Sequence, residues 1–415
     1  MLDYPAILSE IQEVYLADSA PWVIGFSGGK DSTAALQMVF YALASLPPEK
    51  LSKEIHVVSS DTLVENPAVV KRVDEQLGEI ADAGKHQLFA HKPDLFNVAK
   101  VTPKLEDTFW VNLIGKGYPS PNRWFRWCTD RLKIKPTSEY VLKTVNHSGE
   151  AIVVLGTRRA ESSSRAATMD NHAKGGRLHR HATLLGASIY APIADLSNDE
   201  VWAYLLQAPN PWRSDNRRLL SLYVNASGMG ECPFVIETGT QSCGRSRFGC
   251  WVCTVVDRDK SMENLIHNGE EWMEQLLSFR NWLHEIRQET AQHVPKGVDS
   301  SPKFGPFLLA TRRRILDRLL GMQEDLDVEL ISPAELDFVY DLLQREAAGE
   351  VKQGPREFLL KLGDERRLKV ISDFELLAAG RRRLGPTHLT HAELLRTRRV
   401  SSDYARSTRV LYYVQ

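Results

Sequence analysis

Cysteine is scarce in this chain, and its scarcity argues against a fold held together by disulfides. The 415 residues contain five cysteines, and four of them fall between positions 232 and 253. A bunched set of this kind in a long chain is more often a metal site than a disulfide framework. The cysteines are therefore a first candidate for a functional site.

Excess charge and long apolar runs are also lacking. The chain has 52 Lys+Arg against 53 Asp+Glu, so contact with nucleic acid would need a local basic face rather than a global field. No run approaches the roughly 20 apolar residues that a membrane span needs. Residues 1–22 carry acids among their apolar residues, unlike a signal peptide. We expect a cytoplasmic protein with no membrane partner.

The first half of the chain alternates short apolar strands with amphipathic helices. Strands are predicted at 22–26, 54–60, 86–93 and 151–157, and a helix at 67–80. This rhythm predicts an α/β fold with a doubly wound, mostly parallel sheet. Ligands of such sheets bind at the carboxyl ends of the strands. The site is therefore expected in the segments 27–32, 59–67 and 156–165.

The pattern changes after about residue 195. Residues 196–207 predict a short helix with Ser197 or Asn198 as its N-cap. From about Lys260 onward helical periodicity dominates, with a short β element at 409–415. Because the chain is too long for one ordinary domain, we divide it into an α/β domain at 1–225, a cysteine-rich segment at 226–260 and a helical C-terminal region at 261–415.

The segment SGGKDS, Ser27 to Ser32, follows the first strand and precedes a helix. Glycines in this position let backbone N–H groups converge on an anion, which the helix N-terminus further stabilises. The segment is not a Walker A loop, because Lys30 is followed by Asp31, and it is not the G-x-G-x-x-G dinucleotide fingerprint. An ordinary turn with Asp31 and Ser32 as helix caps is the alternative.

This loop resembles the PP-loop of ATP pyrophosphatases, enzymes that split ATP between its α- and β-phosphates and adenylate a substrate oxygen. The resemblance implies ATP and Mg²⁺ as cofactors and makes residues 1–225 the PP-loop domain. Asp31 would help hold Mg²⁺, and Lys30 would point either at phosphate or at solvent. The residues implied to bind pyrophosphate are Ser27, Gly28, Gly29 and Ser32.

Two further segments are similar to the phosphoadenosine phosphosulfate reductase branch of the PP-loop proteins. They are GTRRAESSSR at 156–165 and YAPIADLSNDEVWAYL at 190–205. The resemblance places Asp61 in the adenosine site. Guanidinium groups suit phosphate oxygens, although a solvated helix terminus is the alternative for any one of these arginines. The residues added to the expected nucleotide and substrate site are Gly156, Arg158, Arg159 and Arg165.

Sulfonucleotide reduction itself lacks a nucleophile in this sequence. Reductases of that branch use a cysteine in a C-terminal E-C-G-L-H motif, and no cysteine follows Cys253. The bunched cysteines have the spacing C-x10-C-x6-C-x2-C, and four thiolates this close can hold one metal centre. The spacing fits zinc and a [4Fe-4S] cluster equally, and structural apolar cysteines are the remaining alternative. The candidate ligands are Cys232, Cys243, Cys250 and Cys253.

Several segments together resemble the DNA phosphorothioation sulfurtransferases of the DndC and SspD type. They are SCGRSRFGCWVCTVVDRDKSM, RWCTDRLKIKP, VSSDTLVENP and KFGPFLLATRR, and the similarity extends from Val23 to about Met322. The resemblance favours a [4Fe-4S] cluster over zinc and makes 226–260 an iron-sulfur segment. It also implies the DNA backbone as substrate, a cysteine desulfurase as sulfur donor, and other subunits of a modification complex as partners.

The fifth cysteine, Cys128, stands apart in RWCTDRLKIKP. Cations flank it at 123, 126, 131, 133 and 135, so we expect a lowered thiol pKa and a reactive sulfur carrier or nucleophile near the ATP site. A buried structural cysteine is one alternative. A cluster ligand in place of Cys232 is another. With Asp31, Lys30 and Arg158, Cys128 completes the expected catalytic set.

These parts predict one reaction sequence. A non-bridging oxygen of a DNA phosphodiester attacks the α-phosphate of ATP, pyrophosphate leaves into the SGGKDS loop, and the activated phosphate accepts sulfur as AMP departs. The alternatives are a sulfonucleotide reductase, a PP-loop tRNA thiolation enzyme, and a non-catalytic nucleotide-binding subunit of a defence assembly.

Basic stretches at 311–318, 380–386 and 396–400 are candidates for DNA contact, although each alone is more often a solvated helix face. The segment 123–135 ranks first because it lies with the expected chemistry. Its aromatic residues could stack unpaired bases; they are Trp124, Phe125 and Trp127.

Overall fold

The structure is a computed structural model of the chain, and it describes residues 4–161, 177–181, 183–227, 249–293 and 305–349. The predicted β element at 409–415 lies outside these residues. Among the described helices, none combines the length and the apolar character needed to cross a bilayer.

One six-stranded sheet forms the centre of the α/β part, and its order is β3-β2-β1-β4-β6-β5. All neighbouring strands are parallel except β5 and β6, which are antiparallel. The mostly parallel sheet predicted from the sequence is therefore confirmed. The strands are β1 (Trp22–Gly25), β2 (Ile55–Ser60), β3 (Phe96–Val101), β4 (Ala151–Val154), β5 (His179–Arg180) and β6 (Ala187–Tyr190).

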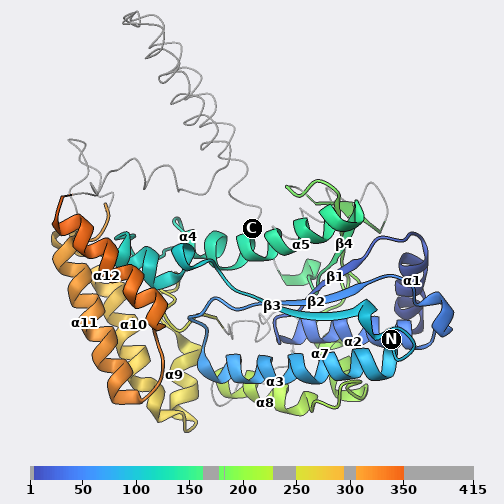
Figure 1. Cartoon of the computed structure of the whole chain (residues 1–415). Helices are drawn as coiled ribbons and strands as arrows, with labels where there is room; N and C mark the ends of the chain where they lie inside the picture. Colours follow the sequence, from blue (N-terminus) through green and yellow to red (C-terminus); the bar gives the residue numbers. More distant parts are fainter. Residues whose placement is uncertain (1–3, 162–176, 182, 228–248, 294–304, 350–415) are drawn as a thin grey trace, which may run out of the picture.

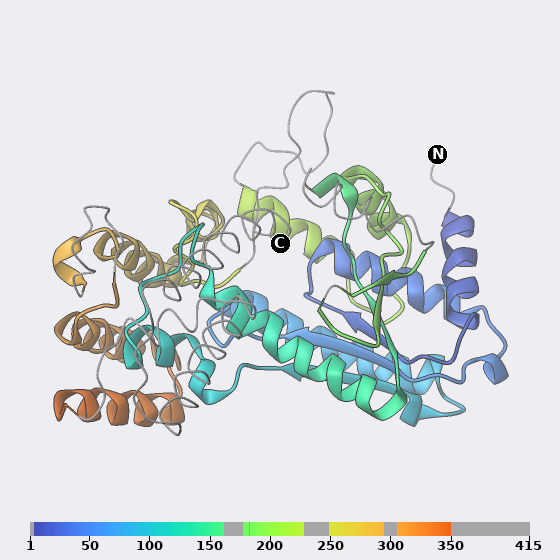
Figure 2. The ribbon, with the colours of Figure 1, turned by 90° about the horizontal axis from the view of Figure 1, so that it is seen from above.

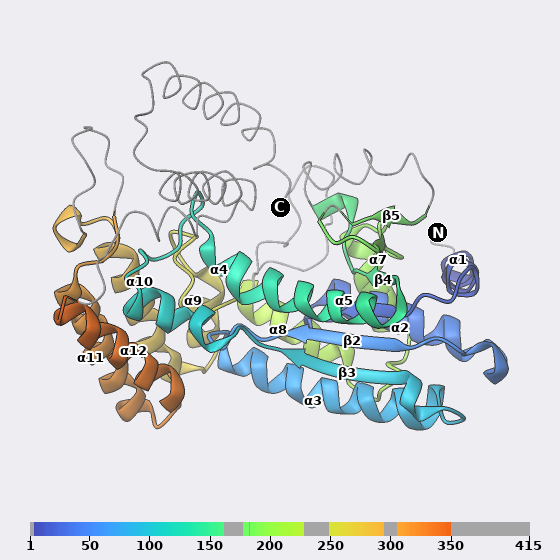
Figure 3. The same cartoon turned by 45° about the horizontal axis from the view of Figure 1, so that its top comes forward.

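Helices cover both faces of this sheet (Figures 1 and 3) because alternate strand residues point to opposite sides. Trp22 and Ile24 of β1 belong to a core shared with α2, whereas Val23 belongs to a core shared with α5. The helices of the α/β part are α1 (Tyr4–Leu16), α2 (Lys30–Ala44), α3 (Pro67–Ala83), α5 (Lys135–Ser148), α7 (Asn198–Gln207) and α8 (Asn216–Ser227).

The predicted strand at 86–93 is wrong. Residues 84–88 instead form a wide helical turn that continues α3, and the strand β3 begins at Phe96. Leu88 and Phe89 are buried in the core, and a short apolar run cannot by itself distinguish a strand from a buried helical turn. The predicted cap of α7 is confirmed, because Ser197 forms a capping box with Glu200.

A second apolar core lies at one end of the sheet, where the helices α9 to α12 gather (Figures 1 and 2). This core also contains Trp110, Trp127 and Leu132. Residues from the predicted α/β domain at 1–225 therefore pack against helices that follow this domain in the sequence. The helices of this part are α4 (Trp127–Thr129), α9 (Lys260–His267), α10 (Glu274–Ile286), α11 (Leu309–Leu326) and α12 (Pro333–Ala347).

Candidate functional site

The SGGKDS loop leaves β1 at the middle of the sheet's carboxyl edge and enters α2 directly. Gly28 has φ of +68°, a conformation that favours glycine. Ser32 closes the loop: its hydroxyl donates to the Gly29 carbonyl at 3.0 Å and accepts from the Ser27 N–H at 3.2 Å. Gly29 is the N-cap residue of α2 and has no side chain to cap it, so the alternative of a turn capped by Asp31 and Ser32 does not describe this helix start.

Asp31 lies between two cations at the first turn of α2. Its carboxylate accepts from Lys30 Nζ at 2.6 Å and from Arg158 Nε at 2.6 Å. Lys30 is only 7% exposed, so the alternative in which its side chain points at solvent is excluded. A carboxylate and two cations in this position are the groups that a magnesium-bound polyphosphate requires.

The two segments similar to the reductase branch meet beside this carboxylate. Arg158 is buried and also donates to the Leu196 carbonyl at 3.1 Å, while Arg159 pairs with Asp195. The loop after β4 is thereby tied to the start of α7. Arg165 lies outside the described residues.

Gly156 packs against the backbone of α2. A Cβ atom at this position would lie 2.7 Å from both the carbonyl carbon and the carbonyl oxygen of Asp31, and 2.8 Å from the Ser32 nitrogen. Real Cβ atoms do not approach backbone this closely. Gly156 is therefore required for the loop after β4 to reach the phosphate loop.

Asp61 follows β2 at the same edge of the sheet. Its carboxylate accepts from the Leu63 N–H at 2.8 Å and lies 3.4 Å from Lys100 Nζ. These contacts shape the turn after β2. Adenosine binding by Asp61 stays a prediction.

The cysteine loop packs against this same turn. The Trp251 N–H donates to the Val64 carbonyl at 3.0 Å, and Cys250 Sγ lies 3.2 Å from Thr62 Oγ1. Because β1 and β2 are neighbours, the cysteine loop and the phosphate loop share one edge of the sheet. Nothing in the sequence spacing indicates the contact between Thr62 and Cys250.

Cys128 lies close enough to Cys250 and Cys253 for the three thiols to influence one another electrostatically. Burial, and secondarily Cys253, raises the pKa of Cys128 to about 11, which is opposite to the lowering that we expected. Burial likewise raises the pKa of Cys250 to about 12, although Lys133 partly opposes this.

Burial outweighs the effect of the neighbouring cations on the pKa of Cys128, and carboxylates pair with three of these cations. Arg131 and Lys135 both donate to the buried Asp107, and Lys133 donates to Glu65 at 2.9 Å. Each of these three cations is therefore paired with a carboxylate, and the pairs stabilise the fold around Cys128.

Cysteine thiolates are donors that zinc and iron-sulfur centres take. Cys250 and Cys253 are brought together with Cys128, the alternative fourth ligand, while Cys232 and Cys243 lie outside the described residues. Within the part of the chain that the structure describes, no set of three or more potential ligands is arranged as a metal site.

Two aromatic residues of the expected DNA-contact segment are available to a ligand to different degrees. Trp124 is 81% exposed, and Phe125 is half-buried and stacks on Tyr118. Trp127, in contrast, is buried in the second core and donates to the Pro119 carbonyl. The expectation that Trp127 stacks on a base is wrong for this reason.

The basic stretch at 311–318 lies on α11 and is partly structural. Arg312 is fully buried and donates to two backbone carbonyls and to Glu346, while Arg314 and Arg318 lie over the ring of Trp282. Arg313 is exposed. The stretches at 380–386 and 396–400 lie outside the described residues.

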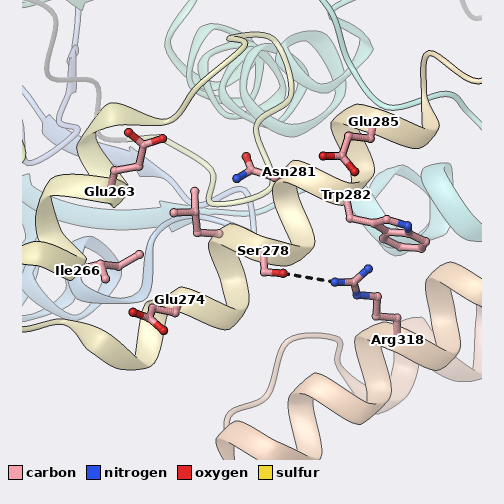
Figure 4. Close-up of a pocket in the computed structure, with 9 residues that line it drawn as sticks. Glu263, Ile266, Glu274, Ser278, Asn281, Trp282, Glu285 and Arg318 are labelled. Atoms are coloured by element: carbon pink, nitrogen blue, oxygen red, sulfur yellow. Dashed lines mark hydrogen bonds between the residues drawn. The ribbon is translucent and has the colours of Figure 1, made fainter.

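A surface groove lies between α9, α10 and α11 (Figure 4). Its lining includes Ile266, Trp282 and Glu274. Arg318 crosses it and donates to Ser278 Oγ at 3.4 Å. The groove belongs to the helical part and is lined by none of the residues expected to bind nucleotide.

A glycine-rich phosphate loop at the central carboxyl edge of a mostly parallel sheet defines an α/β fold of the PP-loop class. The model of the phosphoadenosine phosphosulfate reductase domain matches residues 21–255, which is more than half of the chain, and the chain belongs to this family.

The curated relatives are two uncharacterized proteins of Methanocaldococcus jannaschii. MJ0066 is 27% identical over 202 residues, covering 49% of this chain and 35% of the relative, and MJ0973 is 26% identical over 180 residues, covering 43% and 34%. The chain thus spans about a third of the length of these relatives.

Two solved structures were also found at low similarity. Phosphoadenylyl-sulfate reductase from Candida auris, in a phosphate complex, is 13% identical with a TM-score of 0.32, covering 52% of this chain and 84% of that chain. The U34-tRNA thiolase NcsA from Methanococcus maripaludis, with its [4Fe-4S] cluster, is 13% identical with a TM-score of 0.30, covering 68% and 79%.

Proposed function

We propose that the chain is the ATP pyrophosphatase and sulfurtransferase of a DNA phosphorothioate modification system. In this reaction a non-bridging oxygen of the DNA backbone attacks the α-phosphate of Mg·ATP and pyrophosphate leaves. The outer sulfur of a persulfide supplied by a cysteine desulfurase then attacks the activated phosphorus and displaces AMP, which departs with the original oxygen. A thiol then cleaves the S–S bond, so that sulfur stays on the phosphate and the two thiols are oxidised to a disulfide. Activation is needed because a phosphodiester oxygen is a very poor leaving group until it becomes part of AMP.

The arrangement around Asp31 is the observation that carries the adenylation step. Lys30 and Arg158 neutralise this carboxylate from two sides, and both lie where a polyphosphate would meet the start of α2. Asp31 would help to hold Mg²⁺, which would supply charge neutralisation of the polyphosphate, and Lys30 and Arg158 would bind phosphate oxygens. Such fixed charges stabilise the negative charge that develops on the leaving pyrophosphate.

The thiols at the cysteine loop fit a [4Fe-4S] cluster, with Cys250 and Cys253 as ligands beside Cys232 and Cys243. When bound, such a cluster supplies a site that can hold or pass on sulfur. The chain's own contribution is to hold this loop against the turn after β2, so that sulfur delivered there reaches the edge of the sheet where ATP binds.

A DNA acceptor is supported by two features of the chain. Arg123, Trp124 and Arg126 are exposed next to Cys128, and exposed cations with an aromatic ring suit a nucleic-acid strand. The sequence also has the segments similar to the DNA phosphorothioation family.

The test is to incubate the anaerobically purified chain with Mg·ATP and measure pyrophosphate and orthophosphate, with DNA, with tRNA and without an acceptor. We expect pyrophosphate and AMP, with release stimulated by DNA. Orthophosphate and ADP as products would overturn the adenylation step. Stimulation by tRNA alone would replace the DNA acceptor by the tRNA alternative.

Two sets of variants locate the chemistry. Ser32→Ala should reduce pyrophosphate release, whereas Ser138→Ala, in α5 on the opposite face of the sheet, should not; equal release by both would exclude the loop as the phosphate site. Cys128→Ser should abolish sulfur transfer and keep the iron content if Cys128 carries sulfur. Loss of iron in that variant would instead make Cys128 a cluster ligand.

A further inference from the structure

A buried amide without a partner lies beside the phosphate loop. Gln76, on α3, is 3% exposed, and neither its side-chain nitrogen nor its side-chain oxygen has a hydrogen-bond partner among the described residues. A Cβ atom on Gly28 would lie 3.6 Å from Gln76 Oε1 and 2.6 Å from Val73 Cγ2. Because buried polar groups in native proteins are nearly always satisfied, this amide is a candidate to bind a ligand that enters the loop.

Tyr223 reaches the same loop from α8. Its hydroxyl accepts from the Lys30 N–H at 3.3 Å and lies 3.4 Å from the position of a Cβ on Gly29. It therefore touches the first amide of α2, one of the groups that a phosphate oxygen would use. Burial raises the pKa of the Tyr223 phenol to about 12, so the group is a hydroxyl and a donor at neutral pH.

The helix that carries Tyr223 is anchored at both ends. At the start, Asn216 donates to Gln37 Oε1 at 2.9 Å and to the Leu205 carbonyl at 2.8 Å. At the end, Asn264 of α9 donates to the Ala226 carbonyl at 2.9 Å. The position of the hydroxyl is therefore set by the framework and not by a free loop.

Arg72 supplies charge at the same place. It lies one turn before Gln76 on α3, so the two side chains share a face of that helix. It is half-buried and interacts electrostatically with Tyr223, with the carboxylates of Glu79 and Glu75, and with Arg218, but it forms no ion pair or hydrogen bond within the described part of the chain. A half-buried guanidinium whose N–H donors are not used by a carboxylate is suited to an anion.

We propose that Gln76, Tyr223 and Arg72 form a second wall of the phosphate cradle and bind the leaving pyrophosphate. This inference rests on the proposed function, because it assigns the ligand of the same loop. In this arrangement the Gln76 amide and the Tyr223 hydroxyl donate hydrogen bonds to pyrophosphate oxygens on the side opposite the SGGKDS backbone. The Arg72 guanidinium offsets the negative charge of the pyrophosphate. Lys30 and Arg158 then hold the other side of the cradle.

The test measures binding of Mg·pyrophosphate and of AMP to the full chain by calorimetry, together with the melting temperature. The variants are Gln76→Met, Tyr223→Phe and Arg72→Gln, with Lys71→Gln as the control, because Lys71 is an exposed cation next to Arg72. Each of the three should weaken pyrophosphate binding about tenfold or more, since each removes a hydrogen bond or charge to an anion. AMP binding should stay within about twofold, and Lys71→Gln should change neither.

Gln76→Met separates a binding role from a structural one. Replacing a buried amide that has no partner by an apolar side chain of similar shape should keep or raise the melting temperature, so pyrophosphate affinity and stability should move in opposite directions. Arg72→Lys should recover part of the affinity by restoring the charge.

Unchanged pyrophosphate affinity in all three variants would overturn the second wall and leave the proposed function in place. If the parent chain binds pyrophosphate but releases none from ATP, the proposed function fails and the wall stands. Failure of the parent chain to bind pyrophosphate would overturn both.

Discussion

Replacement of Gly156 by alanine tests the close packing on which the phosphate loop depends. The added Cβ would lie 2.7 Å from two backbone atoms of Asp31 and 2.8 Å from the Ser32 nitrogen. None of these atoms belongs to a flexible side chain, so the loop after β4 or the first turn of α2 must move. Forcing extra atoms into packed structure costs about 1–3 kcal/mol of the free energy of unfolding.

Gly78→Ala is the matched control. Gly78 lies inside α3, and a Cβ atom there meets nothing within 4 Å. Alanine in a helix interior is favoured over glycine by about 0.5–1 kcal/mol, so this variant should be slightly more stable than the parent chain. Replacement of glycine by alanine should therefore lower the free energy of unfolding at position 156 and raise it at position 78.

Urea denaturation followed by tryptophan fluorescence measures the free energy of unfolding, and pyrophosphate release at saturating ATP measures function. We expect Gly156→Ala to lose stability and most of its pyrophosphate release, because the backbone that must move carries Asp31 and Ser32. A Gly156→Ala protein as stable as the parent would refute the packing argument. Reduced stability with full pyrophosphate release would show that this contact does not set the geometry of the loop.

Three further substitutions test the parts around the site. Arg312→Met should cost about 3–5 kcal/mol of the free energy of unfolding, because it leaves two backbone carbonyls and the half-buried carboxylate of Glu346 without their donor. Arg313→Met on the exposed face should stay within about 0.5 kcal/mol, and similar urea midpoints for both variants would contradict the burial of Arg312. Trp127→Ala should cost about 3–5 kcal/mol, and Trp124→Ala should leave the melting temperature nearly unchanged, so a large loss for Trp124→Ala would place that ring in a core. Burial alone would raise the pKa of Asp107, but Lys135 and Arg131 hold this pKa below its usual value. The ionised carboxylate therefore stabilises the fold above about pH 4, and this stabilisation is lost as the pH falls. Asp107→Asn should therefore melt at a lower temperature than the parent chain at pH 7, and melting curves between pH 7 and pH 3 should show the difference between the two melting temperatures becoming smaller as the pH falls.

Most of the central sheet could be predicted because its signals are local. Buried parallel strands are short apolar runs, and the helix signals between them are periodic over a few residues. The position of the phosphate loop follows from the same logic, since a strand, two glycines and a helix occur within about ten residues. The capping box at Ser197 is equally local. Where the local signal was ambiguous, at 86–93, the prediction failed.

The contacts within the site could not be predicted because they join distant parts of the chain. Arg158 meets Asp31 across 127 residues, and Tyr223 meets Lys30 across 193. Spacing in a sequence carries no measure of such approaches. The amide of Gln76 has the pattern of an ordinary core position on α3, and only the packed structure shows that it faces Gly28 without a partner.

The α/β class, the phosphate loop after the first strand and the bunched cysteines could all be recognised in the sequence, because each depends on residues close together along the chain. Which charged groups are available to a ligand follows from the folded structure alone. It neutralises the cations near Cys128 with carboxylates, buries Trp127 and Arg312 in the second core, and places Asp31 between two cations. The physical reason is that burial and ion pairing are set by neighbours in space, and the sheet order and the second core bring those neighbours together.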